Sequence, residues 1–227
     1  MHDIKELLNN IKIRPNSLDL YLLALTHPSY NADVNTKHQD YERLEYMGDA
    51  VLGFAAADLI FKAYPEMDQG LMSKLRSNLV KSSSLADYAR SINLANYIKT
   101  GHSINPDKIN ESNKILEDVF ESLIGAIYLD KGLNVAFKFI SHFLKKDIKN
   151  IQIEDLTDSK TRLQEEMQAE HRDSVHYELV NQSGPAHDRT FVVNVLFNDI
   201  VLGTGSGKSK KMAEEAAAKD ALSKRSI

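Results

Sequence analysis

The hydrophobic period of this 227-residue chain changes once, near residue 155, and this change constrains the possible folds more than any other feature. Before it, apolar residues recur about every 3.6 positions, which predicts amphipathic helices. After it, apolar and polar residues alternate over 175–180 and 189–197, as they do in β-strands. We therefore expect two domains, residues 1–155 and residues 156–227, of which the first contains only helices.

The second region has a compact order of elements. It contains a helix, three strands and a final helix within about 70 residues, which is typical of a small independent domain. The pair Asn198-Asp199 predicts a hairpin turn between the last two strands. The predicted fold class is an all-α domain followed by a small α+β domain of order α-β-β-β-α. The predicted helices of the first region are 4–11, 18–30, 42–64, 72–92, 114–132 and 135–148; the second region has helix 159–171, strands 175–180, 189–197 and 200–207, and helix 208–225.

The composition excludes several classes of protein. The chain has no cysteine, so it contains neither a disulfide framework nor a cysteine-based zinc site. Its first residues carry no long apolar run, so we expect no signal peptide, no membrane span and a cytoplasmic location. The net charge of −4 argues against a nucleic-acid partner when it is taken alone, but the distribution of charge matters more.

Three carboxylates lie on a predicted helix that is otherwise suited to burial, in the stretch YERLEYMGDAVLG. Glu42, Glu45 and Asp49 are spaced i, i+3 and i+7, which places them within about 60° of one another on one stripe. Gathering acids raises their pKa values and costs stability. A solvated helix face is the usual explanation of such a cluster. It fits less well here, because Arg43 is the only basic residue between positions 41 and 61.

A second pair of acids lies on the predicted helix 114–132. Asp118 and Glu121 are spaced i, i+3 among apolar neighbours, whereas we expect Glu117 to point elsewhere, toward solvent. If the two helices pack side by side, four or five carboxylates converge and require a counter-charge. A hard divalent cation satisfies this requirement, and Mg²⁺ also keeps waters and bridges phosphate oxygens. The spacing therefore favours a metal site.

The segment ERLEYMGDAVLG closely resembles the signature of the ribonuclease III family, whose members are endonucleases of double-stranded RNA. The segments ALTHPSY, GLMSKLRSNLV and LEDVFESLIGAIYLD resemble further family segments and occur in the family order. The C-terminal 70 residues resemble a double-stranded-RNA-binding domain. The resemblance covers nearly the whole chain, and it implies an all-α endonuclease domain followed by an RNA-binding domain.

The resemblance assigns roles to individual acids. It implies that Glu45, Asp49, Asp118 and Glu121 ligate a catalytic Mg²⁺, for which Mn²⁺ can substitute. Asp49 and Glu121 are implied as catalytic residues, together with Glu42, which opens the signature and has a supporting role beside the site. The implied reaction is metal-assisted hydrolysis of phosphodiester bonds that leaves 5′-phosphate and 3′-hydroxyl ends.

Two further positions bear on this assignment. In the segment MDQGLMS, Gln69 stands where the family commonly has Glu before the Gly. Gln forms hydrogen bonds but adds no negative charge, which puts a second-metal or substrate-positioning role in doubt and leaves the four principal acids unaffected. We expect His27, in ALTHPSY, to be a structural hydrogen-bonding residue at a helix end rather than a catalyst.

The family also implies a homodimer, with two symmetric active sites along one groove that cut both strands and leave a short 3′ overhang. Tyr46 and Met47 on the signature helix would then contact the partner; the alternative is that both belong to the core of a single chain. The substrates implied by the resemblance are ribosomal RNA precursors and structured messenger RNAs.

The C-terminal region has local clusters of basic residues but no net positive charge, since residues 158–227 carry 10 Lys+Arg and 11 Asp+Glu. Its lysines gather at the start of the last helix, where the helix dipole favours an anion. In double-stranded-RNA-binding domains this place, the loop after the first strand and one side of the first helix contact two minor grooves over about 16 base pairs. The resemblance thus implies RNA contacts by Thr161, Gln164 and Glu165, by Gly184, Pro185 and His187, and by Lys208, Lys210 and Lys211.

The sequence GTGSGKS looks like a phosphate-binding loop for nucleotides but lacks the required spacing. That motif has four residues between its first Gly and the Gly-Lys pair, and Leu202 stands where the first Gly would be. We therefore expect no nucleotide cofactor. Two other functions remain as alternatives. One is an RNA-binding regulator whose nuclease domain only dimerises, favoured by Gln69 alone; the other is a small-molecule phosphohydrolase, which leaves the RNA-binding segments unexplained.

Overall fold

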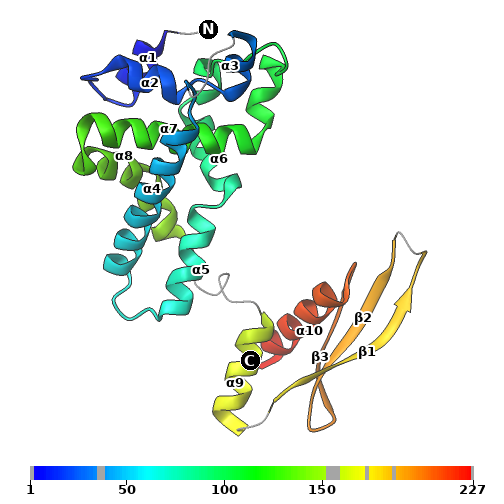
Figure 1. Cartoon of the computed structure of the whole chain (residues 1–227). Coiled ribbons are helices and arrows are strands. Elements are labelled where there is room, and N and C mark those ends of the chain that lie inside the picture. The colour runs from blue at the N-terminus through cyan, green and yellow to red at the C-terminus, as the bar shows by residue number, and fades with distance from the viewer. Residues whose placement is uncertain (1–2, 35–38, 152–158, 172–173, 186–187, 226–227) are drawn as a thin grey trace. The chain divides into compact units, whose positions relative to one another are not determined.

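The computed structural model describes residues 3–34, 39–151, 159–171, 174–185 and 188–225. The chain divides into two compact units, Met1–Ile151 and Gln152–Ile227 (Figure 1). The boundary predicted between residues 155 and 156 lies outside the described residues. None of the described helices combines the length and the apolar character needed to span a bilayer.

The regular elements described for the first unit are all helices, as predicted, with one isolated β-bridge between Thr26 and Lys99. Its central helix is α7, which is buried along most of its length from Leu116 to Ile127. The most extensive helix contact is that between α4 and α7, and α2, α6 and α8 also pack on α7. The elements are α1 (Ile4–Asn10), α2 (Leu18–Ala24), α3 (Pro28–Val34), α4 (Glu42–Ala63), α5 (Gln69–Leu79), α6 (Ser82–Ser91), the 3₁₀ turns η1 (Leu94–Tyr97) and η2 (Pro106–Glu111), α7 (Asn113–Lys131) and α8 (Leu133–Asn150).

Two of the predicted helices are each divided in the structure. The segment 18–30 breaks before Pro28, which opens α3 because its fixed φ suits the first helical position. The segment 72–92 breaks at Lys81, whose extended backbone separates α5 from α6. The hydroxyl of Ser84 donates to the carbonyl of Asn78 at 3.0 Å and so satisfies an end carbonyl of α5. The apolar period continues through both breaks and therefore does not reveal them.

Two glycines allow α4 and α7 to approach at backbone distance. A Cβ atom on Gly48 would lie 1.7 Å from the carbonyl oxygen of Glu121, and one on Gly125 would lie 2.2 Å from the carbonyl oxygen of Leu44. Each helix thus presents a glycine to the backbone of the other. This close crossing brings the acids of α4 beside those of α7.

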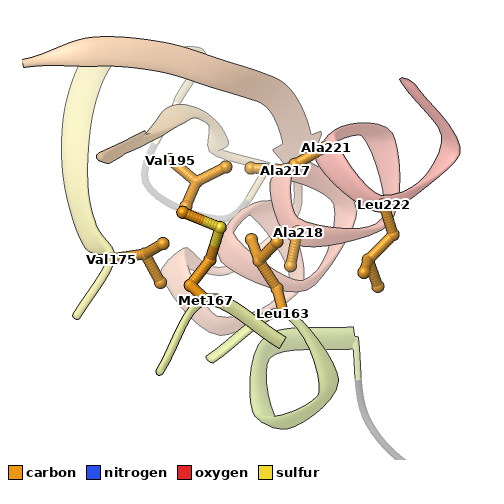
Figure 2. Close-up of a cluster of buried hydrophobic side chains, with 8 residues drawn as sticks. All are labelled: Leu163, Met167, Val175, Val195, Ala217, Ala218, Ala221 and Leu222. Carbon is orange, nitrogen blue, oxygen red and sulfur yellow. The ribbon is translucent and has the colours of Figure 1, made fainter. Parts of the chain in front are cut away.

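The second unit has the predicted α-β-β-β-α order. Its three strands form one antiparallel sheet of order β1-β2-β3. Asn198 and Asp199 have positive φ in the tight turn between β2 and β3, as that hairpin geometry requires. The hydrophobic core joins the sheet to both helices, with Met167 and Val195 among its buried members (Figure 2). The elements are α9 (Ser159–His171), β1 (His176–Ser183), β2 (Thr190–Phe197), β3 (Ile200–Gly207) and α10 (Lys210–Arg225).

The glycines of GTGSG have a packing role in β3. A Cβ atom on Gly205 would lie 2.1 Å from the amide nitrogen of Ala217, and one on Gly203 would lie 2.5 Å from the carbonyl oxygen of Ala217. The alanine-rich face of α10 therefore rests directly on the backbone of β3. Glycines on β3 and the short methyl side chains of alanines on α10 allow this close approach, which explains the composition of both segments.

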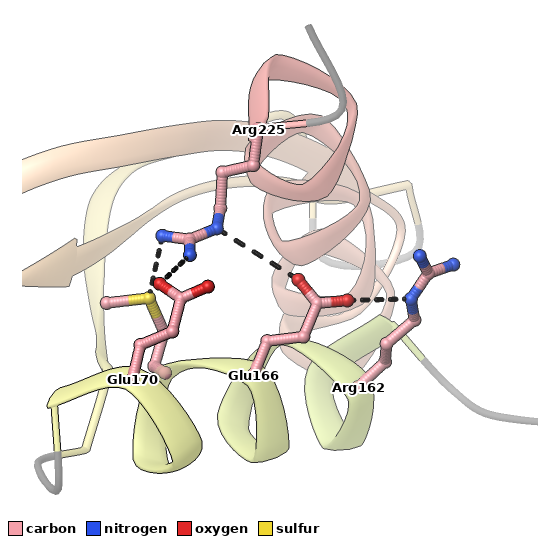
Figure 3. A network of polar contacts seen from close by, with 5 residues as sticks. Arg162, Glu166, Glu170 and Arg225 are labelled. Atoms are coloured by element: carbon pink, nitrogen blue, oxygen red, sulfur yellow. Dashed lines mark hydrogen bonds and ion pairs between the residues drawn. The ribbon is translucent and has the colours of Figure 1, made fainter.

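A polar network joins the end of α10 to α9 (Figure 3). The guanidinium of Arg225 pairs with Glu170 and lies 4.0 Å from Glu166, which also pairs with Arg162 at 3.0 Å. Arg225 also donates to the sulfur of Met167 at 3.0 Å. The network links the end of α10 to α9 and neutralises two carboxylates of that helix.

Candidate active site and RNA-binding surface

An open pocket of about 470 Å³ lies where α4 crosses α7. Carboxylates from both helices line it, together with the ring of Tyr46. Four of the five acids predicted for the site are among them. The lining acids are Glu42, Glu45 and Asp49 from α4, and Glu117 and Glu121 from α7.

Asp118 is the predicted site residue that does not line the pocket. It is 6% exposed, and each of its carboxylate oxygens has a partner. The hydroxyl of Tyr41 donates to Oδ2 at 3.2 Å, and the ammonium of Lys114 donates to Oδ1 at 2.5 Å. The same ammonium lies 3.9 Å from a carboxylate oxygen of Glu45, so one lysine contacts acids of both helices.

The expectation that Glu117 points away from the site is wrong. Glu117 and Glu121 are spaced i, i+4, about 40° apart around the helix, whereas Asp118 and Glu121 are about 60° apart. The i, i+4 spacing was the signal that could have identified Glu117, and the same spacing relates Lys114 to Asp118. Tyr41 meets Asp118 across 77 positions, so only tertiary packing reveals that contact.

Burial and repulsion between carboxylates raise the pKa values of Glu121 and Glu45. The pKa of Glu121 rises from its ordinary 4.5 to about 8, first because the side chain is buried and then because Asp49, Glu117, Glu45 and Asp118 repel its charge. Burial, followed by the charge of Asp118, also raises the pKa of Glu45. Gathering these acids without a cation therefore lowers the stability of the folded protein. Strongly shifted pKa values of this kind are common at functional sites.

The donor set fits a hard divalent cation in its chemistry. It consists of carboxylate oxygens, which Mg²⁺ and Mn²⁺ prefer, and a cation would offset the repulsion that raises the pKa of Glu121. In the described part of the chain, no three acidic or histidine side chains lie close enough together to form a ready-made metal site. Binding of an ion would therefore require some of these side chains to come closer together.

His27 has the structural role predicted for it. Its Nδ1 accepts a hydrogen bond from the backbone N–H of Ser29 at 3.0 Å, at the start of α3. Its ring packs edge-on against Tyr41, with 5.6 Å between ring centroids. Burial lowers the pKa of His27, so the ring is neutral near pH 7. It supports the tyrosine that holds Asp118.

Gln69 lies away from the carboxylates. It lines a separate pocket of about 360 Å³ beside Phe54 and Phe61, between α4 and α5. Both rings are largely exposed, and Tyr46 is 79% exposed. The alternative that Tyr46 belongs to the core of a single chain is therefore wrong, while Met47 is half-buried.

Two of the three predicted RNA-contacting places adjoin each other. Gly184 has a φ of +93°, and a Cβ atom there would lie 2.5 Å from the carbonyl oxygen of Asp188, so the loop after β1 requires glycine. Asp188 pairs with Lys208 at 2.7 Å, which joins this loop to the segment before α10. Pro185 is exposed, and His187 lies outside the described residues.

The remaining predicted contacts lie at the start of α10 and on α9. Lys210 and Lys211 are exposed in the first turn of α10, and the Ser209 hydroxyl caps that helix by accepting from the N–H of Met212 at 3.2 Å. On α9, Thr161 is half-buried, Glu165 is exposed, and the amide of Gln164 donates to the Ser174 hydroxyl at 3.0 Å.

Known proteins share both units of this architecture. The family described as Ribonuclease-III-like matches residues 17–148, and the family described as Double-stranded RNA binding motif matches residues 159–225. Ribonuclease 3 of Lactococcus lactis subsp. lactis (strain IL1403) is 37% identical, covering 96% of this chain and 95% of that protein. Ribonuclease 3 of Onion yellows phytoplasma (strain OY-M) is 41% identical, covering 99% of this chain and 92% of that protein.

Solved structures resemble the first unit. The nuclease domain of ribonuclease III from Campylobacter jejuni is 32% identical, with a TM-score of 0.60, covering 67% of this chain and 100% of that one. Together, the two units define a nuclease that carries a double-stranded-RNA-binding domain, so the predicted fold class and enzyme class are confirmed. The chain belongs to the ribonuclease III family.

Proposed function

We propose that this chain is a Mg²⁺-dependent endonuclease that hydrolyses double-stranded RNA. The observation that carries the proposal is the union, in one chain, of a carboxylate pocket with a double-stranded-RNA-binding unit. The products would have 5′-phosphate and 3′-hydroxyl ends with a short 3′ overhang. Mn²⁺ would substitute for Mg²⁺, and the substrates would be ribosomal RNA precursors and structured messenger RNAs in the cytoplasm.

The acids of α4 and α7 would have two roles at the pocket, binding of the metal ion and support of the residues that bind it. A bound Mg²⁺ would neutralise charge on the scissile phosphate and acidify a water for in-line attack. Glu42, the first residue of α4, lies in the same pocket and would have a supporting role. Gln69 is the one feature that favours an RNA-binding regulator. It lines the pocket beside Phe54 and Phe61 and does not line the carboxylate pocket. The residues that would hold the ion are Glu45, Asp49, Asp118 and Glu121.

The proposal includes a homodimer. Tyr46, Phe54 and Phe61 expose aromatic rings on α4, and exposed aromatic side chains of this kind are enriched where protein partners bind. A second structure of the Campylobacter jejuni nuclease domain, 32% identical with a TM-score of 0.59, covers 63% of this chain and 97% of that one. It describes flexibility in the region involved in dimer formation. Two pockets in one dimer would cut the two strands of a duplex.

Cleavage of a long, end-labelled RNA duplex tests the proposed activity. The full chain is expected to cut the duplex in Mg²⁺ but not in EDTA, and to spare single-stranded RNA. Asp49→Asn is expected to lower the cleavage rate by about 10³-fold, because the ion supplies several kcal/mol of transition-state stabilisation. It should leave duplex affinity, measured in Ca²⁺ on native gels, within about twofold.

One result would contradict the proposed activity, and another would contradict the role of Asp49. Duplex binding without cutting in any divalent metal would favour the regulator over the nuclease. Full cleavage by the purified Asp49→Asn protein in Mg²⁺ would leave the nuclease standing but remove Asp49 from the metal site.

The lysines at the start of α10 are expected to contact RNA phosphates. The double variant Lys210→Gln, Lys211→Gln should weaken duplex binding for every sequence tested and lower the slope of log K against log salt by about two, since each lost phosphate contact removes about one. A matched control is Lys219→Gln, Lys224→Gln, which removes the same charge later along α10. Equal slopes for the two double variants, measured by fluorescence anisotropy in EDTA, would contradict the assignment.

A further inference from the structure

Lys114 occupies an unusual place for a surface lysine. Its side chain is 71% exposed, yet its ammonium lies 2.5 Å from Oδ1 of Asp118, whose side chain is 9% exposed. It also lies 3.9 Å from a carboxylate oxygen of Glu45 on the other helix. Among the described residues, Lys114 is the basic residue whose side chain forms ion pairs with the acids of this site.

The contact with Asp118 conflicts with metal binding. Tyr41 already donates to Oδ2 of Asp118, and Lys114 donates to Oδ1, so both oxygens are engaged by protein donors. An ion that takes Asp118 as a ligand would therefore lie beside one of these donors, and the positive charge of the Lys114 ammonium would repel it. Lys114 is the donor that can move, because its ammonium sits on a flexible four-carbon stem open to solvent, whereas Tyr41 is buried.

We propose that Lys114 is the built-in counter-ion of the carboxylate pocket, a positioning residue that holds Asp118 in the metal-free protein and competes with the divalent cation for it. The inference rests on the proposed function. In the metal-free protein the ammonium of Lys114 neutralises Asp118 and Glu45, and it moves into solvent when the ion binds.

Two opposite effects follow for Lys114→Gln. Without the lysine, the carboxylates of Asp118 and Glu45 lose their cation, so the metal-free protein becomes less stable. The divalent ion then meets neither a competing donor nor a like charge, so it binds more tightly. A residue that served only the fold would lower stability equally with and without the ion.

The experiment is a Mg²⁺ titration of the full chain, followed by the rise in unfolding temperature and by isothermal calorimetry. Lys114→Gln is expected to unfold a few degrees lower than the wild type in EDTA and to reach half-saturation at about three- to tenfold lower Mg²⁺. Lys114→Arg keeps a cation at this position and should stay within about twofold of the wild type. Lys138→Gln, which removes an exposed charge from α8, is the matched control and should change neither quantity.

The outcomes separate this inference from the proposed function. If the wild type shows no Mg²⁺ response, or if Asp49→Asn keeps the full response, the proposed metal site fails. If the wild type responds normally but Lys114→Gln has unchanged or weaker Mg²⁺ affinity, the counter-ion role alone is overturned. An equal loss of unfolding temperature in EDTA and in saturating Mg²⁺ would likewise reduce Lys114 to a structural residue.

Discussion

Glu121→Gln is expected to abolish cleavage and, at the same time, to stabilise the metal-free protein. The loss of cleavage, about 10³-fold or more, follows from removing one of the charged oxygens proposed to hold the ion. The gain in stability follows from the neighbours of this side chain. Glu121 is 8% exposed and faces four other carboxylates, so its ionised form is strongly disfavoured in the folded state.

The sign of the pH dependence follows from the raised pKa of Glu121. Between its ordinary pKa of 4.5 and the folded value of about 8, the folded protein binds a proton that the unfolded chain releases. The folded state therefore binds more protons, and the free energy of unfolding decreases as pH rises across this window. Gln carries no charge at any pH, so the variant should exceed the wild type by about 1–3 kcal/mol near pH 7.

Urea unfolding in EDTA, followed by circular dichroism at 222 nm, measures this difference. The gap between Glu121→Gln and the wild type should widen from pH 5.5 to pH 8, and saturating Mg²⁺ should narrow or reverse it, because the ion stabilises the wild type by binding. Glu66→Gln, at an exposed position before α5, is the control and should show no such gap. A variant that is less stable than the wild type at pH 8 in EDTA would contradict the repulsion argument.

Gly48→Ala is expected to disrupt the first unit. The new Cβ atom would lie 1.7 Å from the carbonyl oxygen of Glu121, and backbone atoms of a buried helix cannot move aside as a flexible side chain does. The two helices would have to separate along their whole contact, which costs at least about 3–5 kcal/mol. This loss is comparable to the total stability of many domains, so we expect a fall in unfolding temperature of about 10 °C or more.

Gly53→Ala provides a matched control on the same helix. A Cβ atom there would meet no other part of the described structure within 4 Å, so the substitution should stabilise α4 by up to about 1 kcal/mol through helix propensity. Thermal unfolding of the two variants, followed by circular dichroism, compares them directly. If Gly48→Ala unfolded within about 2 °C of Gly53→Ala, the crossing would not depend on glycine.

The elements of the fold were largely predictable because burial imposes a period on the sequence. The helices α4, α7 and α8 and the strands β1 and β2 were found from that period, whereas β3 was predicted from the turn at Asn198-Asp199. The breaks at Pro28 and Lys81 were not, because apolar residues on either side stay in phase while the local backbone turns. Backbone capping at such points depends on hydrogen bonds that a periodicity does not record.

The candidate site was predictable in its chemistry and less so in its arrangement. Spacing placed Glu42, Glu45 and Asp49 on one stripe, and the structure puts them in one pocket. The structure replaces Asp118 with Glu117 among the lining residues, because the rotation of α7 against α4 decides which side of the helix faces the pocket. Rotation of a buried helix depends on the packing of all its neighbours.

The class of each region, most acids of the pocket and the family could all be read from the sequence. These properties depend on the local hydrophobic period and on residue identity, which are both features of the sequence. The tertiary structure alone decided that Gly48 and Gly125 set the helix spacing and that Asp118 rests between Tyr41 and Lys114. Such contacts join residues up to 81 positions apart, as Leu44 and Gly125 are, and they exist only once a buried crossing has fixed the distance between two helices.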